Sequence, residues 1–263
     1  MGWYFGTDQQ ITLQEKVDEL TVWCKDTKGA VNGGRFLGTD NIDALGWSKI
    51  LGFLKDGGVF TFRMVSVEKI EELQFELNKH GMRFDSWNVF SADSNTIEKH
   101  TNHFVDLRLP DEYSLIDTEE LADAAVIYKI QECMARNGVA PYSGRLLSGQ
   151  SLPSVTIAVR DRDANVIATA FGYFPYNQYS KWSSTAWGGL VAVDESHRGM
   201  KLGVQVNAIM VRCCVDRLGA KEVQEFAAAT NIPSRKMIER SGLELDPDVV
   251  SGIASAGSSR FTT

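Results

Sequence analysis

The segment DESHRGMKLGVQV, residues 194–206, follows an apolar run and leads into an amphipathic helical pattern. The run before it, WGGLVAV (187–193), has the composition of a strand, and its glycine pair suggests a bulge or a close backbone approach. A strand that turns through Gly199 into a helix exposes the first N–H groups of that helix, which attract phosphate. Arg198 and Lys201 would add positive charge at this corner. The alternative is a plain strand–turn–helix connection with both side chains in solvent.

The composition is that of a soluble globular protein, with 263 residues of which 43% are hydrophobic, and a net charge of −7. The acidic balance and the absence of a Lys/Arg cluster argue against a nucleic-acid partner. No apolar run approaches the roughly 20 residues that span a bilayer, and the N-terminus lacks the features of a signal peptide. We therefore expect a cytoplasmic protein without a nucleic-acid or membrane partner.

The cysteines and histidines give no sign of a disulfide framework or a metal site. The four cysteines have no CxxC spacing, which favours free thiols, and the His100/His103 pair is typical of surface or loop positions. The four are Cys24, Cys133, Cys213 and Cys214.

The chain divides near RLPDEYSLIDTEE (108–120), where Pro110 and Asp111 interrupt an extended run. This predicts an N-terminal α/β lobe over residues 1–110 and a second domain over 111–263. In the lobe, periodicity predicts helices at 11–27, 41–58 and 66–81, a loop at 32–38, and strands at 59–65 and 82–93. In the second domain it predicts helices at 118–138, 201–219 and 231–242, a hairpin at 153–176, and strands at 183–193, 222–230 and 243–254. This order is that of an α/β (α+β) protein with a mixed sheet.

Two segments in the second domain carry a family resemblance. LVAVDESHRGMKLG (190–203) and, downstream, AAATNIPSRKMIERSGLEL (227–245) together resemble the acetyl-CoA-binding core of the GNAT-type N-acetyltransferase superfamily. The family's phosphate loop, Arg/Gln-x-x-Gly-x-Gly/Ala after a strand ending in apolar-x-Val, is matched by Val191, Val193, Arg198 and Gly203. The second signature is matched by Asn231, Ser234, Gly242 and Leu243. The resemblance covers residues 115–255 and implies a mostly antiparallel sheet flanked by helices.

The sequence departs from the family pattern at two positions. Lys201 replaces the central glycine of the phosphate loop. Because helical φ is negative, we expect a side chain to fit there, and its ammonium could contact a phosphate. Ile238 stands where many relatives have a tyrosine that protonates the departing thiolate, which leaves that role to Ser234, water or another residue.

The resemblance implies acetyl transfer from acetyl-CoA to the amine of a small molecule by direct attack, without a metal. Glu225 and Ser234 are the candidate catalytic residues, since a carboxylate on the apolar strand EVQEFAAAT needs a partner or a role. Asn231 would bind the pantetheine arm or serve only as a helix cap. The implied cofactor-binding residues are Val191, Val193, Arg198, Gly199, Met200, Lys201, Leu202, Gly203, Asn231 and Ser234.

Some alternatives stay open at this point. The protein could be a catalytically inactive acyl-CoA-binding regulatory module, whereas a P-loop enzyme lacks its required motif. The aromatic stretch FGYFPYNQYSKW (171–182) is interpreted as core and rim packing or as an acceptor cleft. Residues 1–110 could form a degenerate second lobe of the same fold, cap the acceptor site or build a homodimer.

Overall fold

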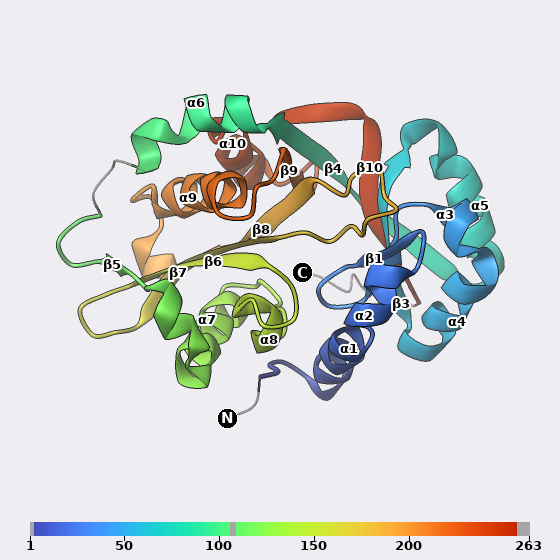
Figure 1. The fold of residues 1–263 in the computed structure, drawn as a ribbon, viewed down its shortest axis with the longest axis horizontal. Coiled ribbons are helices and arrows are strands. Elements are labelled where there is room, and N and C mark those ends of the chain that lie inside the picture. Colours follow the sequence, from blue (N-terminus) through green and yellow to red (C-terminus); the bar gives the residue numbers. More distant parts are fainter. Residues whose placement is uncertain (1–2, 106–108, 257–263) are drawn as a thin grey trace.

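A computed structural model describes residues 3–105 and 109–256 of the chain (Figure 1). Residues 1–2, 106–108 and 257–263 lie outside this range. The first part contains α1 (Asp8–Glu19), α2 (Thr21–Asp26), β1 (Ala30–Asn32), β2 (Leu37–Thr39), α3 (Ile42–Leu45), α4 (Trp47–Gly57), β3 (Val59–Ser66), η1 (Val67–Lys69), α5 (Ile70–Lys79), β4 (Met82–Asp93) and α6 (Ser94–Val105).

The second part adds the remaining strands and helices. They are β5 (Ser114–Leu115), η2 (Thr118–Ala122), α7 (Ala124–Arg136), α8 (Gly144–Leu147), β6 (Ser154–Arg160), β7 (Val166–Tyr173), β8 (Thr185–Val193), η3 (Glu195–His197), α9 (Leu202–Asp216), β9 (Glu222–Ala227), α10 (Ile232–Arg240) and β10 (Glu244–Ala256).

The described strands form one sheet in the order β1-β2-β3-β10-β4-β9-β8-β7-β6-β5. The pairs β2–β3 and β8–β9 are parallel and the other neighbouring pairs are antiparallel. Helices α6, α9 and α10 lie above the sheet and α7 and α8 lie below it in the view of Figure 1. The predicted fold class, a mixed and mostly antiparallel sheet flanked by helices, is therefore confirmed.

Strands from the two ends of the chain alternate in the middle of the sheet. Strand β4 lies between β9 and β10, and β10 lies between β3 and β4. Residues on both sides of position 110 therefore share one sheet. The division into domains at 1–110 and 111–263 stays a prediction, and it does not correspond to two separate sheets.

Several local expectations were wrong for identifiable reasons. The predicted helix over 41–58 is split at Gly46, whose φ of +86° is incompatible with helix. The helix predicted over 118–138 begins later: residues 118–122 form a 3₁₀ turn, and α7 is capped by Asp123, whose carboxylate accepts from the Ala125 N–H at 2.8 Å. The loop expected at 32–38 contains the end of β1 and the start of β2, and α6 was not predicted.

Helix α9 packs closely on the sheet because two strand glycines face it. A Cβ on Gly188 would lie 2.5 Å from Cε of Met210, and a Cβ on Gly172 would overlap Cys214 Sγ. The close approach expected from the glycine pair in WGGLVAV is therefore present. Cys24, Cys133, Cys213 and Cys214 are all free, as predicted, and all four are buried.

The loop after β7 ties the second half of the chain to the first. Asn177, which is 8% exposed, donates through Nδ2 to the carbonyl oxygens of Cys24, Thr27 and Ala30 at 2.7, 2.7 and 3.0 Å. Tyr173 adds a bond from its hydroxyl to the Asn32 carbonyl at 2.7 Å. These bonds hold β1 and the loop before it against the end of β7 and the loop that follows β7.

We expect Asn177→Ala to lower the free energy of unfolding by about 1–3 kcal/mol, because three carbonyls, in two buried bonds and one partly buried bond, lose their shared donor. Asn78→Ala, on the exposed side of α5, is the matched control and should change stability by less than about 0.5 kcal/mol. Urea unfolding of both variants measures the difference. Equal effects would show that the Asn177 bonds do not hold the two parts together.

Candidate active site

Strand β8 carries a bulge where it passes the middle of the sheet. Thr169 pairs with Ala192 and Phe171 with Gly189, so Leu190 and Val191 together face the single residue between Thr169 and Phe171. Leu190 has a φ of +51°, a conformation that side chains rarely adopt. The bulge expected from the glycine pair lies immediately after it.

The parallel ladder between β8 and β9 ends at the bulge. Gly188 pairs with Glu225, and residues 189–193 of β8 have no partner on β9. The two strands therefore separate in the interior of the sheet, and β8 presents an edge of main-chain groups toward the gap.

A cavity of about 270 Å³ lies at this separation. Its wall includes Trp187 and Tyr142, which pack with the α7 side of the sheet, and Met237 and Ile238 of α10, which pack with the α9 side. Because its lining comes from both faces, the cavity passes through the sheet where the strands part. The N-terminal part of the chain contributes Gly33, Arg35, Phe36, Thr61, Arg63 and Trp87.

Glu225 lies in the wall of this cavity and is 2% exposed. Burial raises the pKa of its carboxyl group to about 7, and the hydrogen bond from Asn207 Nδ2, at 2.9 Å, opposes part of that rise. Asn207 lies on α9, and its Nδ2 also donates to Ser241 Oγ at 3.1 Å, which fixes its side chain. A carboxyl group with this pKa can accept a proton near neutral pH.

Helix α10 contributes Ser234, Met237 and Ile238 to the cavity, and Ser234 has the only polar side chain among these three. Ser234 is in the first turn, where its N–H donates to Asn231 Oδ1 at 3.1 Å, so Asn231 does act as the cap of α10. Ile238 is 1% exposed, and the tyrosine in the described wall, Tyr142, packs with the α7 side of the sheet and not on α10.

The turn into α9 differs from the expectation at Lys201. Lys201 is not helical but has a φ of +64°, in the left-handed region, and Gly199 has a φ of +83°. The helical φ predicted for Lys201 is therefore wrong, and the backbone adopts the conformation that favours the glycine of the family pattern. The helix begins at Leu202, and no side chain caps it, in contrast to α7 and α10. Its first N–H groups are left for a ligand or for water.

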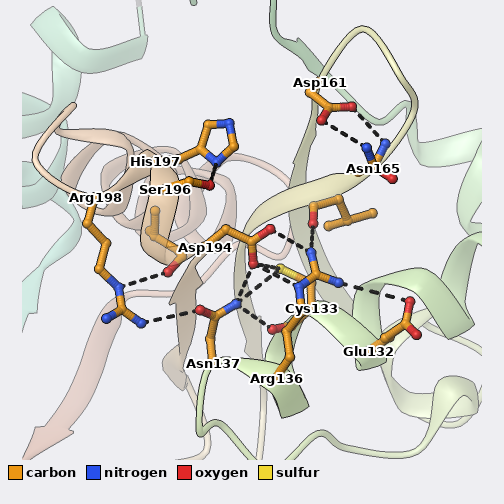
Figure 2. A network of polar contacts seen from close by, with 12 residues as sticks. Glu132, Cys133, Arg136, Asn137, Asp161, Asn165, Asp194, Ser196, His197 and Arg198 are labelled. Atoms are coloured by element: carbon orange, nitrogen blue, oxygen red, sulfur yellow. Dashed lines mark hydrogen bonds and ion pairs between the residues drawn. The ribbon is translucent and has the colours of Figure 1, made fainter.

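Arg198 bonds back to the strand and to the end of α7 (Figure 2). Its Nε donates to the Val193 carbonyl at 3.2 Å and its Nη2 to Asn137 Oδ1 at 3.3 Å. Asp194 joins the same network through two bonds from Arg136, at 2.9 and 2.7 Å, and one from Asn137, at 2.6 Å. In this structure, Arg198 therefore helps to fix the turn in place.

The remaining predicted residues belong to β8, to the turn into α9 and the start of that helix, and to the start of α10. Val191 and Ser234 line the cavity with Glu225, whereas Met200 is exposed beside the turn. A Cβ on Gly203 would lie 3.5 Å from Val193 Cγ2, so the helix start and the end of β8 are adjacent.

Sequence reasoning missed two arginines of the cavity, Arg35 and Arg63. Arg63 could have been noticed as the one charged residue in the apolar strand VFTFRMV. Arg35 lies in a glycine-rich loop that gave no signal of its own. Among the described residues, no group of three or more His, Cys, Asp or Glu side chains could hold a metal ion, and no helix is long and apolar enough to cross a membrane.

No family model matches the sequence, and neither does any curated protein. Among solved structures, the chain is similar to a GCN5-related N-acetyltransferase from Kribbella flavida (13% identity, TM-score 0.53, 85% of this chain and 79% of that one). It is also similar to a GCN5-related N-acetyltransferase from Sphaerobacter thermophilus (16% identity, TM-score 0.51, 86% and 76%). A tandem GNAT protein from the clavulanic acid biosynthesis pathway matches over 93% of this chain and 89% of that one (14% identity, TM-score 0.50). At these identities the likeness concerns the fold, and the chain has the fold of the GCN5-related N-acetyltransferases.

Proposed function

We propose that the protein transfers an acetyl group from acetyl-CoA to the amine of a small molecule. The observation that carries this proposal is the end of the β8–β9 ladder at Gly188 and Glu225. There, an unpaired main-chain edge, a cavity through the sheet and a carboxyl group with a pKa of about 7 lie together.

The residues present fit a coenzyme A molecule. The uncapped start of α9 offers N–H groups and the positive end of a 15-residue helix to the pyrophosphate, with Lys201 exposed beside them. The edge of β8 from residue 189 to 193 can bond to an extended chain of amides, as the pantetheine arm is. Bound acetyl-CoA supplies an activated acetyl thioester.

The protein's own groups then have definable tasks. Glu225, directly or through a water molecule, takes a proton from the substrate ammonium so that the nitrogen can attack. The main-chain N–H of Val191 would donate to the carbonyl oxygen, where negative charge develops. A C–N bond forms, the C–S bond breaks, and the nitrogen loses its second proton, which passes through Ser234 or a water molecule to the leaving sulfur.

Titration with acetyl-CoA, followed by an assay of thiol release over a panel of amines, tests this function. We expect micromolar binding and amine-dependent release of thiol. Binding without turnover on any amine would favour an acyl-CoA-binding regulatory module, for which the apolar Ile238 in the cavity wall is the specific argument. Absence of binding would contradict both functions.

Lys201→Gly should change stability and coenzyme A binding in opposite directions. Glycine relieves the left-handed φ of +64°, which should raise the free energy of unfolding by about 0.5–1 kcal/mol. Loss of the ammonium should weaken coenzyme A binding about fivefold.

The matched control for Lys201→Gly is Ala164→Gly, at a φ of +61° in the turn between β6 and β7. This variant should be stabilised by a similar amount with an unchanged dissociation constant. Thermal unfolding and calorimetry measure both quantities. Unchanged coenzyme A affinity in Lys201→Gly would show that the lysine is not part of the coenzyme A site.

Glu225→Gln should lower kcat by about 10²–10⁴-fold. In the wild type, kcat/KM should rise with pH and level off above a pKa near 7, because the ionised carboxylate is the active form. The rise should be lost in the variant. The pH profile is measured with acceptors whose amines differ in pKa, so that the titration of Glu225 is distinguished from that of the substrate amine.

Stability gives a second readout of the same carboxyl group. Because its pKa is raised above the ordinary value of 4.5, folding favours the protonated form. The wild type should therefore lose stability relative to Glu225→Gln as the pH rises from about 4.5 to about 7. A constant difference between the two proteins over this range would show that the buried carboxyl is not perturbed.

A further inference from the structure

Two arginines reach the cavity from the N-terminal part of the chain. Arg63, on β3, is 5% exposed, and its guanidinium lies over the rings of Trp187 and Phe226 at 5.2 and 4.9 Å. Arg35, in the loop between β1 and β2, lies over the ring of Tyr142 at 5.4 Å and donates through Nη1 to the Ala140 carbonyl at 2.8 Å. Both side chains are thus fixed in position by aromatic faces.

Neither guanidinium has an acidic partner in the described part of the chain. No ion pair of Arg35 or Arg63 is found there, and Arg63 Nη1 and Arg35 Nε are buried without a hydrogen-bond acceptor. The indole N–H of Trp187, in the same wall, also has no acceptor. Three donor atoms on residues that line one cavity, one from each of these side chains, therefore have no acceptor.

The groups around the arginines do not neutralise them. Burial raises the pKa of Tyr173 and Tyr176, which face Arg63, so both phenols stay neutral. Glu225 is the one acidic residue among those that line the cavity, and burial and Asn207 set its pKa without a contribution from either arginine. Burial, with the charge of Arg63 acting in the same direction, lowers the pKa of Arg35.

Unpaired buried cations are costly, and a planar guanidinium matches the geometry of a carboxylate or a phosphate. An oxyanion between Arg35 and Arg63 would satisfy the free N–H groups and compensate both charges. The cavity connects these arginines to Glu225 and Val191, where the amine would react.

We propose that the acceptor is a small amine that also carries an oxyanion, a carboxylate or a phosphate, which Arg35 and Arg63 bind. This inference rests on the proposed acetyl transfer for its amine end. The oxyanion stays on the α7 side of the sheet, and the amine extends through the gap between β8 and β9. A cavity of about 270 Å³ has room for an acceptor on the scale of an amino acid.

Matched acceptor pairs test the proposal on the wild-type protein. Thiol release from acetyl-CoA is compared for amino acids and their carboxamides, and for phosphoethanolamine and ethanolamine. We expect kcat/KM to be about 10- to 100-fold higher for the anionic member of at least one pair, and the two kinds of pair distinguish carboxylate from phosphate. Equal rates within both kinds of pair would overturn the proposal.

Arg63→Met and Arg35→Met remove a charge and retain an apolar side chain. Each should lower kcat/KM about 10- to 100-fold for the anionic acceptor and leave its neutral counterpart unchanged. Arg162→Met, in the exposed turn between β6 and β7, is the control and should alter neither. If the arginines had a purely structural role, their replacement would lower kcat/KM equally for both members of a pair. That result would overturn the proposal. Should Arg63→Met fail to fold, Arg35→Met gives the same test.

Calorimetry with the N-acetylated form of the anionic acceptor separates this proposal from the proposed function, because it requires no turnover. The protein could bind this product, lose about tenfold or more of the affinity in Arg63→Met, and yet transfer no acetyl group. That result would support the oxyanion site and contradict the proposed acetyl transfer. Acetyl transfer without preference for an anionic acceptor would support the proposed acetyl transfer and contradict the oxyanion site. If the protein neither bound this product nor transferred an acetyl group, both proposals would be contradicted.

Discussion

The site depends on the point at which β8 and β9 stop sharing hydrogen bonds. A continuous ladder would satisfy every main-chain group and close the sheet. Here, the bulge at Leu190 and Val191 ends the pairing at Gly188 and Glu225 in the middle of a ten-stranded sheet. The gap creates the cavity, leaves an edge for a ligand and places a buried carboxyl group at the point of divergence. Each part of the proposed chemistry uses one of these consequences.

The sequence of elements in the N-terminal part resembles that around the site. Strand β3, α5, β4 and α6 follow one another as β8, α9, β9 and α10 do, and Met64 of β3 has a φ of +56°, close to the +51° of Leu190. This repetition supports the interpretation of residues 1–110 as a degenerate second lobe. However, β10 lies between β3 and β4 and pairs with both, so the equivalent gap is filled. In our account this part supplies Arg35 and Arg63 to the cavity instead of a second cofactor site.

Much of the fold was predictable because its signals are local. Glycines that end helices, the Asn231 cap and the glycine pair in β8 each act over a few residues, and in the first part the strand over 82–93 was predicted to the residue. Glu225 could be singled out because a carboxyl group on an apolar strand is conspicuous. The insertion of β10 between β3 and β4 was not predictable, since it joins segments that are far apart in sequence. The pairing of Arg35 and Arg63 in one cavity depends on that arrangement and was missed for the same reason.

The central claim is that the separation of β8 and β9 holds the acetyl donor. A crystal structure of the protein with coenzyme A tests it most directly. The account predicts the pyrophosphate at the N–H groups of Leu202 and Gly203, the pantetheine arm along residues 189–193, and the thiol in the cavity near Val191 and Glu225. Coenzyme A bound elsewhere, with the gap between β8 and β9 filled only by solvent, would contradict it.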